Sequence, residues 1–339
     1  FYLESSLKGE PPYAEAGYLV DLEDYVDYDA LVEPWAKTFA VSGDITYLWP
    51  LEAYAPFMYY NKEAFAKAGV QVPASGRFTT DEFIEACRKL AVAGYIPMSA
   101  GTMDRDWAAA IFPEVMLLKA LGPERWRELS SGKLSWEDPD VVKTLQFVEE
   151  LVRLGAFPRG VAAIKLGESH GVFFRGDAAM FPMKSFFAGR AFVPEEAGGM
   201  PESLQLGIMD FPIFAGGKYN DYSYMEVGGS YGVSVFSKHP DKAAELLAHM
   251  ADPDVLSYWV GEVKVQTGLR SGAAHVDHWY IDLIAEAQKG LEYVAGPFSL
   301  GMNASYRDAF FQSCEALLAG QMTAKQMIQQ MEMARRMIR

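Results

Sequence analysis

The stretch YLWPLEAYAPFMYYNKEAF, residues 47–65, is the most informative about the expected fold and raises the question of what its aromatic rings face. Six of its first fourteen residues are aromatic, in a chain that is only 14% aromatic overall. The run FMYYN after the second proline has the composition of a buried strand, whose successive side chains point to opposite faces. Helices cover both faces of a sheet in a layered α/β fold. Four side chains are therefore expected in the core: Phe57, Met58, Tyr59 and Tyr60.

The length of the chain indicates two domains or lobes. At 339 residues it exceeds what a single hydrophobic core usually serves. Half of the residues are apolar and 22% are charged, which is the composition of a folded globular protein. No run reaches the roughly eighteen apolar residues of a membrane-spanning helix.

The net charge argues against a nucleic-acid partner. Thirty basic and forty-five acidic side chains give a net charge of -15. A field of that sign repels phosphate backbones and anionic lipid headgroups. We therefore expect no binding to nucleic acid.

Residues that usually carry catalysis or bind metals show no recognisable pattern. Cys87 and Cys314 fall inside expected helices and lack metal-ligand spacing. The chain contains no nucleophile elbow, zinc motif or phosphate-binding loop. A glycosidase, which needs two carboxylates in a cleft, is a weak alternative because adjacent acids such as Glu149 and Glu150 lie on an expected helix surface. We expect neither an enzyme nor a cofactor or metal site.

Helical patterns alternate with short apolar runs, which predicts an α/β fold. The helix expected at 79–94 begins at a threonine cap, carries acids in its first turn and ends at a glycine. Further helices are expected at 138–157, at 240–250, after the break at Asp252 and Pro253, and from 323 onward. Buried strands are expected at 57–61, 178–183, 206–212 and 231–237.

Six segments, taken in order, resemble the extracellular solute-binding proteins of ATP-driven importers, in particular the sugar-binding group that includes maltose-binding protein. The segments are AGYLVDLEDYV (16–26), LWPLEAYAPFMYYNKEAFAKAGV (48–70), FTTDEFIEACRKLAVAGYIPMSAG (78–101), FFRGDAAMFPMKSFF (173–187), GGSYGVSVFSKHPDKAAELLAHM (228–250) and LLAGQMTAKQMIQQM (317–331). Each is a weak signal alone. Their shared order along almost the whole chain makes the resemblance specific.

The chain departs from the family pattern at three places. Phe186 stands where the family often has tryptophan, and Asp177 stands where it usually has lysine. The first change affects an expected wall of the ligand cleft, and the second affects an expected surface position. Family members also carry a signal, a first strand and a first helix pair before the segment that Phe1 matches, so we expect the start of the first lobe to lie outside this sequence.

The resemblance implies a bilobal, periplasmic-binding-protein-like (type II) α/β fold with the ligand in the cleft between two lobes. Hinge segments would cross between the lobes near 52–56, 227–231 and 296–299, where Pro, Gly and small residues suit a segment that rotates. The expected first lobe contains residues 1–52 and 231–296. The expected second lobe contains residues 53–230 and 297–339.

The resemblance also implies a function. The chain would be the extracytoplasmic substrate-binding component of an ABC transporter. It would capture a mono- or oligosaccharide by lobe closure and deliver it to transmembrane permease subunits. It would act as a monomer in the periplasm, or lipid-anchored outside the cell membrane. Acidic side chains near the expected cleft leave one alternative open, a receptor for a cationic solute such as a polyamine.

The expected ligand contacts combine rings with polar side chains. A sugar presents an apolar face of C–H groups and a rim of hydroxyls, which suit aromatic surfaces and carboxylates, amides or arginine. The expected residues are Trp49, Glu52, Tyr54, Asp106, Trp107, Phe186, Tyr224, Glu226, Gly229, Tyr231, Arg270 and Tyr306. Core packing or capping remains the alternative for the rings and acids, and simple solvent exposure remains the alternative for Arg270.

Overall fold

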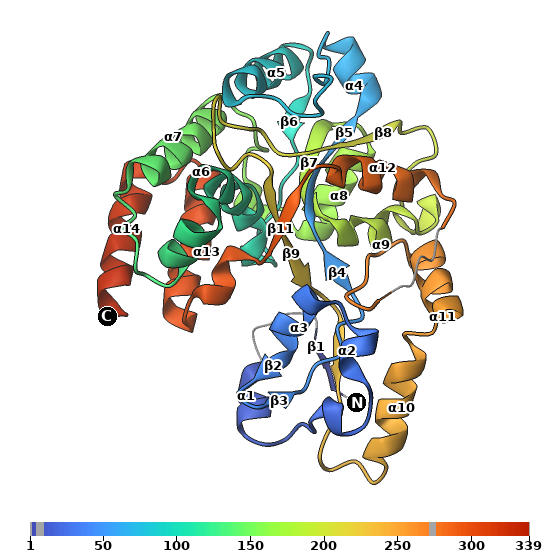
Figure 1. The fold of residues 1–339 in the computed structure, drawn as a ribbon. Helices are drawn as coiled ribbons and strands as arrows, with labels where there is room; N and C mark the ends of the chain where they lie inside the picture. The colour runs from blue at the N-terminus through green and yellow to red at the C-terminus, as the bar shows by residue number, and fades with distance from the viewer. Residues whose placement is uncertain (1, 5–9, 271–275, 339) are drawn as a thin grey trace.

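The computed structural model describes residues 2–4, 10–270 and 276–338 of the chain (Figure 1). Buried apolar side chains within these residues form two separate clusters, so the molecule has two cores. The smaller cluster draws on residues between 14 and 51 and between 227 and 269. The larger cluster draws on residues between 55 and 224 and between 265 and 331. The predicted bilobal α/β fold is confirmed.

A four-stranded mixed sheet, in the order β6-β7-β5-β8, forms the centre of the larger body. Its strands are β5 (Pro56–Asn61), β6 (Ile96–Met98), β7 (Ala178–Lys184) and β8 (Leu206–Met209). β5 pairs antiparallel with β7 and β8, and β6 pairs parallel with β7. Phe57, Met58 and Tyr59 are buried as predicted, and Tyr60 is half-buried against the same core.

Helices pack around this sheet and begin where the sequence places their caps. Asn61 is the last residue of β5, and its side chain accepts hydrogen bonds from the backbone amides of the first turn of α4. Thr79 forms a capping box with Glu82 at the start of α5. The helices are α4 (Lys62–Lys67), α5 (Thr80–Val92), α6 (Ile111–Ser130), α7 (Pro139–Arg153), α8 (Leu166–Phe174), α9 (Ala188–Ala191), α12 (Trp279–Gln288), α13 (Ala304–Leu318) and α14 (Ala324–Met337). Short 3₁₀ turns are η2 (Asp106–Ala110), η3 (Val161–Ala163), η4 (Ser185–Phe187), η5 (Glu195–Ala197) and η7 (Phe298–Gly301).

A second, three-stranded sheet lies between the two bodies, in the order β11-β9-β4 (Figure 1). Its strands are β4 (Ala53–Tyr54), β9 (Tyr222–Val227) and β11 (Glu292–Ala295). β9 runs antiparallel to β4 and parallel to β11. The three strands therefore bring together the chain segments in which hinge crossings are predicted.

The smaller body is made of short elements around Trp49 and Tyr28. The elements are β1 (Tyr2–Glu4), α1 (Glu10–Glu15), η1 (Leu22–Asp24), α2 (Tyr28–Leu31), α3 (Pro34–Ala40), β2 (Val41–Ser42), β3 (Ile45–Thr46), β10 (Ser230–Gly232), α10 (Pro240–His249), α11 (Pro253–Tyr258) and the π-helical turn η6 (Trp259–Val263). β1 pairs antiparallel with β10. Because its elements are short, this body buries fewer apolar side chains than the larger one.

Two parts of the chain differ from expectation. The strand predicted at 231–237 ends at Gly232, because the backbone turns at Ser234, whose carbonyl accepts the Ser237 amide at 3.0 Å. Helix α12 lies in a segment assigned to the first lobe, yet Tyr280 and Ile284 belong to the larger core, where the hydroxyls of Tyr280 and Tyr59 are 3.1 Å apart. The apolar face of α12 therefore packs with the larger body.

Candidate ligand-binding site

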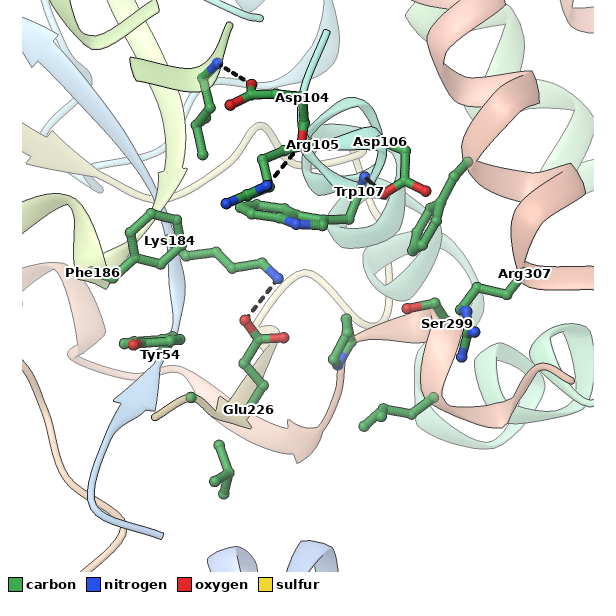
Figure 2. Close-up of a pocket in the computed structure, with 16 residues that line it drawn as sticks. Tyr54, Asp104, Arg105, Asp106, Trp107, Lys184, Phe186, Glu226, Ser299 and Arg307 are labelled. Carbon is green, nitrogen blue, oxygen red and sulfur yellow. Dashed lines mark hydrogen bonds and ion pairs between the residues drawn. The ribbon is translucent and has the colours of Figure 1, made fainter. Parts of the chain in front are cut away.

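A cavity of about 540 Å³ lies where the three-stranded sheet meets the larger body (Figure 2). Ligand pockets for small molecules commonly have volumes of about 300–1,000 Å³. Its lining comes from β4, β7, η4, β9, the segment that enters η2, the first residue of α8, and the segment from Pro297 to α13. The lining residues are Tyr54, Asp104, Arg105, Asp106, Trp107, Leu166, Lys184, Phe186, Glu226, Val227, Gly228, Pro297, Ser299, Leu300, Arg307 and Phe311.

Three aromatic rings form a continuous part of the wall. The Phe186 ring meets the Tyr54 ring edge-on, with centres 5.2 Å apart, and meets the Trp107 ring edge-on at 5.9 Å. Edge-to-face contacts at such distances are favourable and hold each ring in place. Phe186 is supplied by η4, directly after β7, and Tyr54 by β4. The cavity thus offers ring surfaces that are already ordered.

A buried ion pair lies beside these rings. Lys184 Nζ is 2.7 Å from Glu226 Oε1, and both side chains are at most 10% exposed. The Lys184 ammonium also lies 4.8 Å from the centre of the Trp107 ring, a cation–π distance (Figure 2). The pair therefore presents one cationic donor and one carboxylate acceptor to the cavity. Burial raises the pKa of the Glu226 carboxyl, and the charge of Lys184 partly offsets this effect.

A second carboxyl, Glu114, lies behind this pair on the first turn of α6 and is only 2% exposed. Its Oε2 accepts a long hydrogen bond of 3.4 Å from the Tyr224 hydroxyl, and its Oε1 has no partner among the described residues. Burial raises the pKa of Glu114 to about 8, and the positive charge of Lys184 only partly opposes this rise. At neutral pH this raised pKa favours the protonated form of Glu114.

Two carboxylates, one just before η2 and one at its first residue, hold the segment that contains Trp107. Asp104 Oδ1 accepts the Leu166 amide at the start of α8 at 2.8 Å, and Asp106 Oδ1 accepts the Trp107 amide at 2.9 Å. Charged acceptors of backbone N–H groups form strong hydrogen bonds. These bonds orient Trp107 toward the cavity and explain why acids precede it in the sequence.

Glu52 organises the first crossing segment. Its Oε2 accepts the Gly229 amide at 2.9 Å and also accepts the Tyr54 hydroxyl. A side chain at position 228 would meet the Tyr54 ring 2.0 Å from its Cβ, so glycine is required for this close approach. Gly228 lines the cavity, whereas Glu52 and Gly229 support it from behind.

The cavity brings together five of the twelve residues expected to contact ligand. They are Tyr54, Asp106, Trp107, Phe186 and Glu226. Tyr224 is fully buried next to the cavity, with its ring 6.0 Å from Lys184 Nζ.

Four other expected contacts lie away from the cavity. Trp49 is fully buried in the smaller core, edge-on to Tyr28, and its backbone pairs with Tyr231. Arg270 Nε donates to carbonyl groups of the smaller body. The hydroxyl of Tyr306 accepts Trp136 Nε1 at 2.6 Å inside the larger core. Packing or surface hydrogen bonding accounts for each position, and a ligand role there stays a prediction.

The most informative residues that sequence reasoning missed are cationic. Lys184, Arg105 and Arg307 all line the cavity. Lys184 is the last residue of β7, whose seven residues are all buried. Lysine is rarely buried without a partner, so a lysine that ends an apolar strand is the sequence signal that could have indicated it. Arg307 follows Tyr306 by one residue, and the roughly 100° turn between helical neighbours places the arginine in the cavity and the tyrosine in the core.

A two-lobed α/β chain with rings and a buried ion pair at the junction of its lobes has the architecture of a solute receptor. The family model for bacterial extracellular solute-binding proteins matches residues 7–256, and the chain belongs to this family. Members of this family bind solutes for transport and are not enzymes. The predicted family is confirmed.

Two curated relatives show how far the similarity extends. An uncharacterized ABC transporter extracellular-binding protein of Pyrococcus horikoshii, PH1214, is 27% identical over 173 residues, which are 49% of this chain and 38% of that protein. The sn-glycerol-3-phosphate-binding periplasmic protein UgpB of Rhizobium meliloti is 27% identical over 164 residues, which are 47% of this chain and 34% of that protein. The aligned regions thus span about a third of each relative's length.

Among solved structures, a chitin oligosaccharide binding protein has a TM-score of 0.80 to this chain at 19% identity. The superposition covers 96% of this chain and 80% of that protein. The fold is therefore shared over nearly the whole length described.

The described part of the chain contains neither a membrane-spanning helix nor a metal-ligand cluster. None of its helices is both long and apolar enough to cross a membrane. No group of three or more His, Cys, Asp or Glu side chains among the same residues is arranged to hold a metal ion.

Proposed function

We propose that this chain is the substrate-binding component of an ABC importer, acts outside the cytoplasm and binds a neutral sugar in the cavity around Trp107. The observation that carries the proposal is the combination of Trp107, Phe186 and Tyr54 with the Lys184–Glu226 pair in one cavity, where the three-stranded sheet meets the larger body. The bound sugar would be delivered to transmembrane permease subunits, the partner that this family membership supports.

The chemistry of the lining supports a hydroxylated ligand. The ring surfaces suit the C–H face of a sugar, while Lys184 donates and Glu226 accepts hydrogen bonds with hydroxyls. Arg105 and Arg307 add planar donors, and Arg307 Nε is buried with no hydrogen-bond partner among the described residues. A ligand hydroxyl in the cavity would give such donors an acceptor.

Closure of the two bodies is the proposed means of capture. The three-stranded sheet joins the two cores, and Gly228 and Pro297 at its ends line the cavity directly. A ligand that contacts both bodies binds the closed form more tightly and shifts the population toward it. Hinge rotation and ligand binding would then occur at the same place in the chain.

The geometry does not favour the alternative of a cationic ligand, because each of the three carboxylates that line the cavity among the described residues already has a partner. Glu226 is paired with Lys184, and Asp104 accepts a backbone amide. Three cationic side chains, Lys184, Arg105 and Arg307, balance the three carboxylates of the same lining, so the lining has no net negative charge to attract a polyamine.

A calorimetric and thermal-shift panel tests the proposal. The protein would be unfolded and refolded to remove bound ligand, then titrated with maltose, N,N′-diacetylchitobiose, xylobiose, glycerol-3-phosphate and spermidine. A sugar at about one hundred times its Kd should add about 2.7 kcal/mol to the free energy of unfolding. We expect a shift with at least one neutral sugar, little changed by 0.5 M salt because stacking on rings is not screened.

The panel also defines failure. A response to spermidine alone, weakened by salt, would replace the proposal with the cationic alternative. A response to glycerol-3-phosphate alone would assign an anionic ligand. Absence of any response from the folded chain would count against this cavity as a receptor site.

A further inference from the structure

Glu114 is the buried acid that direct ligand contact does not use. It does not line the cavity, but it interacts electrostatically with two buried groups that do, Lys184 and Glu226. A buried carboxyl with an unpartnered oxygen is costly to keep unless it serves another group. Its position next to the residues that line the cavity indicates that this group is Lys184.

The charged and titratable groups that face Glu114 come from several elements. β7 supplies Lys184, β9 supplies Tyr224 and Glu226, and α13 supplies Cys314. The backbone amide of Ser299 in η7 also favours the ionised carboxylate, though weakly. The cluster therefore has one ammonium for two carboxyls, and it is neutral only when one carboxyl carries a proton.

The position of Lys184 decides which carboxyl that is. Its Nζ is 2.7 Å from Glu226 Oε1 and lies over the Trp107 ring, whereas Glu114 receives the long bond from Tyr224 and weak support from the Ser299 amide. The carboxylate with the close cation keeps its negative charge, and the other keeps its proton. An ionised Glu114 would attract the same ammonium from behind, away from the ring and the cavity.

We propose that Glu114 is a positioning residue for ligand binding. Glu114 carries a proton in the ligand-bound protein, so it does not draw the Lys184 ammonium away from Glu226 and the Trp107 ring. This inference rests on the proposed function of the cavity. A ligand that fills the cavity removes water from above Lys184 and Glu226, which makes an uncompensated negative charge behind them more costly. Ligand binding therefore transfers a proton from solvent to the Glu114 carboxylate whenever that carboxylate is ionised beforehand.

The direction of the resulting pH dependence follows from linkage. Because burial raises the pKa of Glu114 to about 8 in the free protein, the acid is mostly protonated at pH 6.5 and mostly ionised at pH 9. Affinity therefore falls as the pH rises through about 8. If ligand raises this pKa by one further unit, Kd should increase roughly fivefold between pH 6.5 and pH 9.

The test is a calorimetric titration of wild type, Glu114→Gln and Glu124→Gln with N,N′-diacetylchitobiose, xylobiose and maltose at pH 6.5, 8 and 9. The amide introduced by Glu114→Gln would mimic the protonated acid, so this variant should bind at all three pH values about as tightly as wild type binds at pH 6.5. Glu124 is less buried on the same helix, and its variant should retain the wild-type pH profile. A merely structural role for Glu114 would change stability but leave the pH profile of Kd unmoved.

Proton uptake gives a second readout that needs only the wild type. Titrations at pH 8 in phosphate and in Tris, whose ionisation enthalpies differ, should show that a fraction of a proton is taken up per ligand bound. Glu114→Gln should show none. Binding without proton uptake, or an unchanged pH profile in Glu114→Gln, would overturn the inference while leaving the receptor function standing. Failure of every sugar to bind at every pH would overturn the receptor function and the inference with it.

Discussion

Lys184 and Glu226 form a buried ion pair, Nζ to Oε1 2.7 Å, that joins the four-stranded sheet to the three-stranded sheet. Lys184 ends β7 of the sheet inside the larger body, and Glu226 lies on β9 of the sheet between the two cores. A buried charge left without its partner is strongly destabilising. The pair therefore couples the ligand cavity to the stability of the junction.

Removing only one charge of this pair should be costly. Lys184→Met leaves Glu226 buried and unpaired, and we expect the free energy of unfolding to fall by about 3–5 kcal/mol. The double variant Lys184→Met/Glu226→Gln should recover most of that loss but not sugar binding. Urea denaturation and calorimetry measure the two effects. Lys242→Met, which breaks an exposed pair with Glu245, should change stability by less than about 1 kcal/mol. Equal losses in the single and double variants would contradict this account.

Trp107→Ala should weaken sugar binding more than it weakens the fold. Its half-buried ring lines the cavity and contacts both Phe186 and Lys184. Loss of ring stacking and of the cation–π contact should raise Kd about tenfold or more. Trp279, whose ring is 47% exposed and outside the cavity, provides the matched control Trp279→Ala. Calorimetry would measure the Kd of each variant for the sugar that raises the melting temperature most. Similar Kd values for both variants would show that Trp107 does not contact the ligand.

Gly228→Ala should disturb the junction through one methyl group. The added Cβ would lie 2.0 Å from the Tyr54 ring, so either the ring or the crossing segment must move. We expect weaker sugar binding and a destabilisation of about 1–3 kcal/mol from overpacking. Gly189→Ala has open space around its Cβ and should leave both quantities unchanged or slightly improved. Thermal melts and titrations of the two variants provide the comparison. Identical results would show that the Tyr54 ring can move aside without a measurable cost.

His170 should make the fold sensitive to acid. Its Nδ1 is 2.9 Å from the Leu166 carbonyl, which it meets as donor, and burial lowers its pKa to about 4. The unfolded chain binds this proton below about pH 6.5 while the folded chain does not, so stability falls as the pH falls from 6.5 toward 4. The loss from this group should reach about 2 kcal/mol at pH 5 relative to pH 8.

The check on His170 is a series of urea denaturation curves between pH 8 and pH 5. His170→Gln removes the titrating group and should flatten the dependence. The exposed His239→Gln should not. An equally steep fall in His170→Gln would assign the acid sensitivity to other groups.

Local sequence signals predicted most helices and the central strands. Thr79 with Glu82, Asp138 and Thr323 cap their helices as their residue types indicate, because capping depends on neighbours within one turn. The prediction failed at 231–237, where an apolar run turns at Ser234. The turn depends on hydrogen bonds that an apolar pattern does not reveal.

The site was predictable in kind and only partly in detail. Residues beside strands and crossings, such as Tyr54, Phe186 and Glu226, line the cavity as expected. Which of two adjacent residues faces the cavity and which faces the core depends on the exact rotation of the helix or backbone at that point. Arg307 rather than Tyr306 faces the cavity, and Gly228 rather than Gly229 lines it. Residue type alone does not determine which neighbour faces the cavity.

Periodicity, helix caps and ordered motifs were enough to predict the α/β class, the two-lobed organisation and the family, and they pointed to three of the rings that line the candidate cavity. Which acids and bases meet could be learned only from the packed molecule. Lys184, Glu226 and Glu114 are far apart in the chain, and their shared charge cluster exists because β7, β9 and α6 pack together. Both carboxyls are buried, and the closeness of Lys184 to Glu226 then favours the proton on Glu114, a relationship that no local pattern encodes.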